Sequence, residues 1–119
     1  MCDKVLFISS IFMFLGNFPF IVISKHSSFI KYYYLTGLTT SLLNHGFNSS
    51  ILQSFDRSTM ILGVIVDTYY IIDTTDFQLL WLSIYSYFIA KYTGYKFFHV
   101  YAHILITILH NKILLQTFY

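Results

Sequence analysis

Near its N-terminus the sequence contains an apolar run, Val5 to Ser24, without a single charged side chain. As a helix, this run would be about 30 Å long, which matches the hydrocarbon core of a bilayer. Of all 119 residues, 56% are apolar and only 10% are charged, and Glu is absent. A soluble domain usually carries about 25% charged residues. So few charges cannot coat a water-facing surface, and the sequence predicts that the chain is solvated by a bilayer.

Four more apolar segments follow the first, separated by short polar stretches. We expect membrane spans at residues 5–24, 29–45, 59–72, 77–90 and 97–115, with a polar loop from Gly46 to Ser58. No small-x-small cleavage site closes the first run, so we interpret it as a retained span. No repeat or linker divides the chain. The expected fold is therefore one all-α domain, residues 1–119, forming a polytopic transmembrane bundle of five helices in a multi-pass integral membrane protein.

Charge and cysteine content exclude several classes of partner and crosslink. The net charge of +2 is too small to indicate a nucleic-acid partner, and the single cysteine, Cys2, excludes an internal disulfide. The partners expected from this composition are the lipid bilayer and a membrane lipid.

The last apolar segment carries a stripe of histidines within the sequence HVYAHILITILH, residues 99–110. His99 and His103 are four residues apart, so they share one face of a helix. His110 lies about 20° from the same line. Each imidazole nitrogen in such apolar surroundings needs a hydrogen-bond partner, a water or a metal.

The number of spans determines which polar residues share one side of the membrane. With five spans, the second span ends on the side where the third and the fifth begin. His45, Asp56, His99 and His103 are therefore all expected near this one membrane boundary. Three imidazoles with an open fourth position are the usual ligand set of a catalytic zinc.

Two interpretations of this set remain open from spacing alone. As a zinc site, Asp56 would accept a proton from a zinc-activated water and Ser41 would hydrogen-bond the water or oxyanion. As structure, a histidine within a membrane helix is a helix–helix contact, Ser41 is a packing residue and Asp56 is a solvated helix start. The apolar residues around the set suit an acyl chain better than a sugar or nucleotide.

Taken together, the pattern Ser41-x-x-x-His45, Asp56 and His99-x-x-x-His103 resembles the signature of the CREST superfamily of membrane proteins. This superfamily includes alkaline ceramidases and the progestin and adipoQ receptors, and it is implicated in lipid-amide and lipid-ester hydrolysis. The short gap between His45 and Asp56 is similar to that of the ceramidases. The resemblance implies that His45, His99 and His103 bind Zn²⁺, and that Ser41 and Asp56 are catalytic.

The chain also departs from the family pattern. The family has seven spans, and the 42 residues between Asp56 and His99 leave room for only one helical hairpin. Without the two missing spans, the site would be open to lipid, would be closed by a second copy of the chain in a homo-oligomer, or would have lost its activity. The expected function is zinc-dependent hydrolysis of a lipid amide or ester. The alternatives are a non-catalytic receptor- or scaffold-like protein with a structural metal, and a heme- or metal-handling bundle.

A second polar pair is expected deeper in the membrane. Asp67 follows Asp56 by eleven residues and His110 follows His99 by eleven, which is about 16 Å along each helix. Both side chains therefore lie at the same depth. Because an unpaired carboxylate is costly there, we predict that Asp67 pairs with His110. Asp67 facing a water-filled cavity is the alternative.

Overall fold

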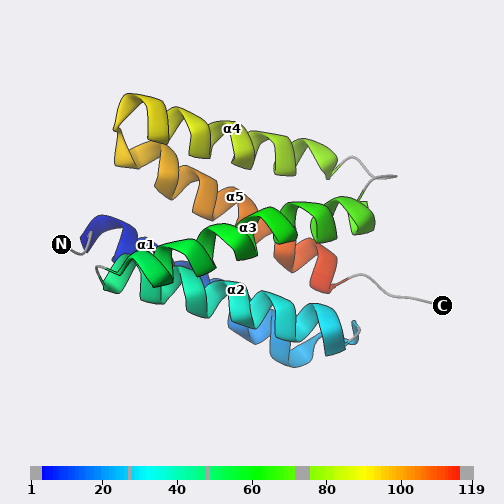
Figure 1. Ribbon diagram of the computed structural model, residues 1–119. Coiled ribbons are helices and arrows are strands. Elements are labelled where there is room, and N and C mark those ends of the chain that lie inside the picture. Colours follow the sequence, from blue (N-terminus) through cyan, green and yellow to red (C-terminus); the bar gives the residue numbers. More distant parts are fainter. Residues whose placement is uncertain (1–3, 27, 48, 72–75, 116–119) are drawn as a thin grey trace.

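The computed structural model describes residues 4–26, 28–47, 49–71 and 76–115, and every regular element in these ranges is an α-helix (Figure 1). This confirms the all-α prediction and its five helices. Their bounds are α1 Lys4–Ile23, α2 Ser28–Gly46, α3 Ser50–Ile71, α4 Phe77–Thr93 and α5 Lys96–Leu114.

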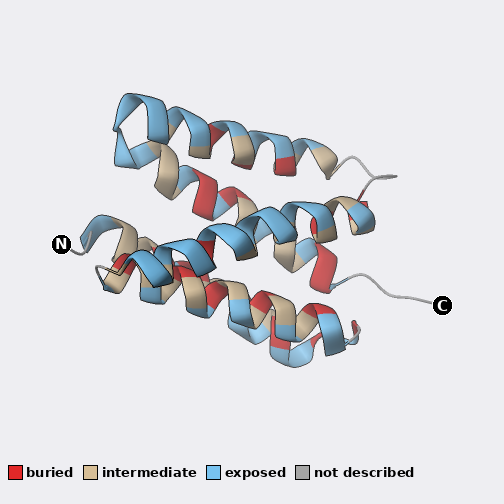
Figure 2. Ribbon diagram, in the orientation of Figure 1, coloured by how far each residue is buried: buried red, intermediate tan, exposed pale blue. Residues whose placement is uncertain are grey.

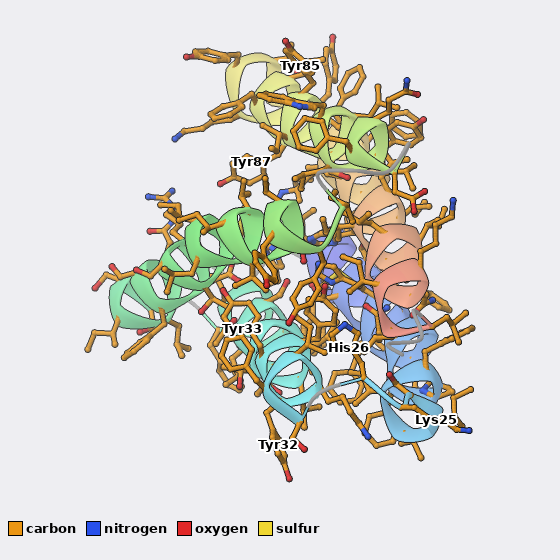
Figure 3. The ribbon with its side chains drawn as sticks, turned by 90° about the vertical axis from the view of Figure 1, so that its right-hand side faces the viewer. Lys25, His26, Tyr32, Tyr33, Tyr85 and Tyr87 are labelled. Carbon is orange, nitrogen blue, oxygen red and sulfur yellow. The ribbon has the colours of Figure 1, made fainter. Side chains whose placement is uncertain are left out.

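The helices follow one another around an open ring. α1 packs between α2 and α5, α4 lies along α5, and α3 lies on α2 with few contacts to α4 (Figure 1). On α2, Tyr32 points away from the bundle, whereas the Tyr33 hydroxyl donates to the carbonyl of Thr59 on α3 at 2.7 Å (Figure 3). The core between the helices is formed by Met13, Ile21, Ile30, Tyr34, Leu38, Ile71, Leu80, Leu109, Ile113 and Leu114.

The third helix begins earlier than the sequence predicts. Residues 50–58, which we expected in a polar loop, form the first turns of α3. The Ser49 hydroxyl accepts the backbone N–H of Leu52 at 3.4 Å, so Ser49 satisfies one of the N–H groups left free at this helix start. The predicted loop is therefore wrong from residue 50 onward, and Asp56 lies inside α3.

A tight turn joins α4 to α5 and makes them antiparallel neighbours. Gly94 has a φ of 76°, in the left-handed region, and its N–H donates to the carbonyl of Ala90 at 2.9 Å. This is the usual way in which glycine ends a helix. The turn places His99 within the first two turns of α5, beside the last turns of α4.

Two of the described helices, α1 and α5, are long and apolar enough to cross a membrane. Figure 2 shows exposed residues along α3 and α4, and in α1 and α5 only 28% of the residues in each apolar window are buried inside the bundle. Among their exposed residues are Phe12 (70%) and Leu15 (61%). α4 has 17 residues, and α2 carries several threonines along its length.

Candidate metal centre

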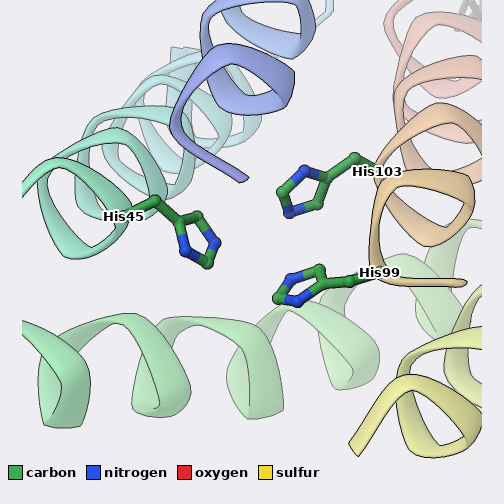
Figure 4. Close-up of side chains that lie close together, drawn as sticks. All are labelled: His45, His99 and His103. Carbon is green, nitrogen blue, oxygen red and sulfur yellow. The ribbon is translucent and has the colours of Figure 1, made fainter. Parts of the chain in front are cut away.

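Three histidines from two helices meet at one end of the bundle. His45 lies in the last turn of α2, and His99 and His103 lie one turn apart on α5. One ring nitrogen of each lies within 4.8 Å of the other two, and the rings point toward one another (Figure 4). The ring centroids of His45 are 5.0 Å from His99 and 5.5 Å from His103. The structure thus brings together the three histidines that the sequence singled out.

The geometry of these nitrogens fits a metal ion after a small adjustment. If three nitrogens were 4.8 Å apart, each would be about 2.8 Å from their centre, whereas a Zn–N bond is about 2.0–2.1 Å. Closing this difference requires each imidazole to move by less than about 1 Å, which side-chain rotation supplies. Three nitrogen ligands without a thiolate suit Zn²⁺.

The helix α1 holds one of the three imidazoles in place. The Ser9 hydroxyl lies 2.8 Å from Nδ1 of His103, which is 8% exposed. When the Nδ1–H donates to Ser9, the lone pair of Nε2 remains for a metal ion. Such an orienting contact is usual for metal-binding histidines.

Ser41 lies one turn before His45 on α2 and is buried. Its hydroxyl is 3.3 Å from the hydroxyl of Ser10 on α1. Ser41 lines a cavity of about 280 Å³ that His99 and His103 also line. The structure therefore places this serine at the cavity that two of the three histidines line.

Asp56 lines the same cavity and is 6% exposed. One carboxylate oxygen accepts a hydrogen bond from the side-chain amide of Asn44 at 3.0 Å. Asp56 also lines a second, more polar cavity of about 460 Å³ at the end of the bundle, together with His45, His99 and Arg57. This carboxylate thus stands between an apolar chamber on one side and a polar opening on the other.

Tyr87 of α4 lies at the boundary between the same two cavities (Figure 3). Its ring meets the ring of His99 edge-on at 5.3 Å. α4 therefore contributes an aromatic wall beside the histidines.

The predicted pair of Asp67 and His110 is confirmed. Nε2 of His110 lies 2.8 Å from a carboxylate oxygen of Asp67, which is 1% exposed. His110 thus lies on the same stripe of α5 as His99 and His103 but pairs with Asp67, which was predicted at the same depth.

Sequence reasoning missed the residues that support the site. Ser9 and Ser10 form the only adjacent hydroxyl pair in the first apolar run, and this pair was the available signal. Asn44 directly precedes a predicted ligand, but its helical position does not reveal Asp56 as its partner. These contacts depend on how α1 and α3 are rotated about their axes.

None of the protein-family models, curated proteins or solved structures compared with the chain matches it. The function of the chain is therefore inferred from its own residues and their geometry.

Proposed function

We propose that the chain is a five-span, multi-pass integral membrane protein that uses Zn²⁺ to hydrolyse a lipid amide or ester, as a shortened relative of the CREST superfamily. The observation that carries the proposal is the meeting of His45, His99 and His103 beside two cavities. Ser41, His99 and His103 line the apolar cavity, His45 and His99 line the polar one, and Asp56 lines both. This set combines three nitrogen ligands, an acid–base group and a hydroxyl donor.

The outer surface of the bundle supports a membrane location. Large apolar side chains are exposed on all five helices, among them Phe12, Val22, Phe29, Ile61 and Leu82. Monomeric soluble proteins rarely expose so extended an apolar surface. A surrounding bilayer would cover it, and α2, α3 and α4 would then cross beside α1 and α5.

The arrangement supports hydrolysis in which Asp56 acts first as a base and then as an acid. A zinc ion held by the three histidines would polarise the scissile carbonyl and acidify a water molecule. Asp56 would take the proton of this water as its oxygen attacks the carbonyl carbon. Ser41 would donate a hydrogen bond to the developing oxyanion. The C–N or C–O bond then breaks, and Asp56 returns the proton to the leaving amine or alcohol.

The two cavities suggest how substrate and water reach this centre. The cavity of about 280 Å³ has mostly apolar walls, contributed by residues such as Leu38, Leu80 and Ile106. An acyl chain suits such walls. The polar cavity beyond Asp56, which is lined by Arg57 and Lys91, would admit water and release the polar product.

α3 and α4 make few contacts with each other. A seven-span CREST protein has two more helices than this chain, and we propose that the gap between α3 and α4 is where they are missing. Here the cavity faces either the lipid or a second copy in a homo-oligomer. Size-exclusion chromatography with light scattering on the protein in detergent would separate these two arrangements.

The direct test is hydrolysis of a fluorescent ceramide analogue by the purified, zinc-loaded chain in lipid nanodiscs. Ser41→Ala and Asp56→Asn should each lower turnover by about 10²–10⁴-fold, because each removes a group that acts on the reacting atoms. Both variants should retain the zinc content of the unmodified chain.

Matched controls are available on α4. Ser86→Ala removes another buried hydroxyl, and Asp76→Asn removes a carboxylate that pairs with Lys112 at the opposite end of the bundle. Both should keep full turnover. Zinc binding without turnover would instead assign the chain to the receptor- or scaffold-like class.

A further inference from the structure

A buried polar triad lies deeper in the bundle than the histidine cluster. Asp67 of α3 accepts a hydrogen bond from the hydroxyl of Tyr34 on α2 at 2.7 Å, and its other oxygen lies 2.8 Å from Nε2 of His110 on α5. The rings of Tyr34 and His110 are stacked, with centroids 3.9 Å apart. Three helices therefore contribute one side chain each to this triad.

The triad lines the same apolar cavity as the histidine cluster. Tyr34, Asp67 and His110 line it at one end, and His99 and His103 at the other. His103 and His110 are seven residues apart on α5, which is about 10 Å along the helix. The walls between the two ends are mostly apolar. The chamber thus has two polar ends and an apolar middle.

The hydrogen bonds within the triad define what it offers to a ligand. With Asp67 ionised, the Tyr34 O–H and the His110 Nε2–H both donate to its carboxylate. A carboxylate only accepts hydrogen bonds and has room for further donors, and the second nitrogen of a neutral imidazole also accepts. The donors of Tyr34 and His110 are therefore used within the triad, on the Asp67 carboxylate, and acceptors remain for a ligand in the cavity. A complementary ligand group must be a donor, such as a hydroxyl or an amine.

We infer that Asp67 and His110 form a second binding site, which holds a hydroxyl or amino group at the far end of an apolar chain whose carbonyl lies at the histidine cluster. The position of the carbonyl rests on the proposed function, whereas the recognition of the far donor rests on the triad alone. The substrate class is then an amide or ester of a medium-length acyl chain that carries a hydroxyl or amine at its remote end.

The geometry favours this role over helix packing alone. A packing triad needs only internal hydrogen bonds, whereas this triad also lines a cavity whose other walls are mostly apolar. The His110 side chain is 18% exposed, while the Asp67 side chain behind it is 2% exposed. The accessible acceptor is therefore the imidazole, backed by the negative charge of the Asp67 carboxylate to which it is hydrogen-bonded.

The test measures binding of four amides to the metal-free full chain in lipid nanodiscs by isothermal titration calorimetry. The probes are decanamide, ω-hydroxydecanamide and ω-methoxydecanamide, with ω-aminodecanamide to distinguish an amine from a hydroxyl. The hydroxy or the amino compound should bind about tenfold more tightly than decanamide, as expected for one hydrogen bond to a charged group. The methoxy compound accepts but does not donate, so it should gain nothing.

Two variants locate the effect in the triad. Asp67→Asn keeps the shape of the side chain but removes its charge, and His110→Phe keeps the stacking on Tyr34. The advantage of the donor-bearing compounds should fall to about twofold or less in both variants. Asp76→Asn, which removes an exposed ion pair with Lys112, should leave the advantage unchanged. Circular dichroism of each variant checks that its helices are intact.

Equal binding of decanamide and both donor-bearing compounds would overturn the inference. An advantage that persists in both Asp67→Asn and His110→Phe would also overturn it. Because the protein is metal-free, these outcomes do not depend on hydrolysis. If the donor advantage is present but zinc-loaded protein cleaves neither decanoyl nor ω-hydroxydecanoyl amides, the proposed hydrolysis fails and the second binding site stands.

Discussion

The Ser9 hydroxyl lies 2.8 Å from Nδ1 of His103, although the two residues are 94 positions apart in the sequence. This contact joins the first helix to the last at the candidate metal centre. When the Nδ1–H of His103 donates to Ser9, Nε2 is left for a metal ion. The adjacent Ser10 contacts Ser41 instead, so two neighbouring hydroxyls of α1 support different parts of the site.

The first prediction separates the roles of these two serines. Ser9→Ala should weaken zinc binding by about 10–100-fold, because it removes the group that orients His103. Ser10→Ala should leave zinc affinity within about twofold, because its partner Ser41 is not a ligand. It should lower turnover, because Ser41 loses the hydroxyl that positions it. Competition with a zinc-sensitive chelating dye measures the affinities. Equal zinc affinity in Ser9→Ala and the unmodified chain would show that Ser9 does not orient the metal site.

The second prediction concerns His26 in the turn between α1 and α2. Burial lowers the pKa of His26 below its ordinary value of 6.5. The unfolded chain therefore binds a proton at His26 more readily than the folded chain does. The stability of the folded chain is not reduced by this residue above about pH 6.5, and it falls as the pH drops from there through the folded-state pKa. His26→Gln should make the loss of thermal stability below pH 6.5 shallower.

The measurement for His26 is the difference in unfolding temperature between the two proteins at each pH. This difference removes the contribution of the other histidines, which both proteins share. His26 packs edge-on against Tyr70, and glutamine retains part of this packing. Identical pH profiles would contradict the assignment of this effect to His26.

The third prediction concerns an amide pair between α1 and α5. Asn17, which is fully buried, donates to Oδ1 of Asn111 at 2.6 Å and to the carbonyl of Thr107 at 3.2 Å. Asn17→Ala leaves these acceptors without their donor, which costs about 1–3 kcal/mol of unfolding free energy. Chemical denaturation in detergent measures the loss. Thr36→Ala, at an exposed hydroxyl bonded to its own helix, should change stability by less than about 0.5 kcal/mol.

The fourth prediction addresses the membrane. Because apolar side chains such as Phe12, Val22 and Ile61 are exposed on the outer surface, the expressed chain should stay in the membrane pellet after extraction with alkaline carbonate. Detergent should release it. Release of the folded chain by carbonate alone would contradict a multi-pass integral location.

Much of the fold follows from simple features of the sequence. Long runs with few charges predict helices, and four of the five observed helices agree with the predicted segments to within a few residues. The helix count also places His45 beside His99 and His103, because successive helices alternate in direction. The equal depths of Asp67 and His110 predict their pairing.

The remaining features depend on how each helix is rotated about its axis. The apolar character of α1 is nearly uniform, so the sequence does not show that Ser9 and Asn17 face α5. The early start of α3 was also not predicted, because its first turns contain serine and glutamine in a segment typical of a loop. In the structure these serine and glutamine side chains are exposed, and Asp56, bonded to Asn44, is the buried residue of the segment.

The metal content of the purified chain shows whether His45, His99 and His103 hold a metal ion. Inductively coupled plasma mass spectrometry should find about one zinc per chain in the unmodified protein. His99→Ala should lose this zinc, while His110→Phe, whose imidazole pairs with Asp67, should retain it. Well-folded protein that binds no zinc when zinc is supplied, or that binds it equally after His99→Ala, would contradict the assignment of His45, His99 and His103 as a metal centre.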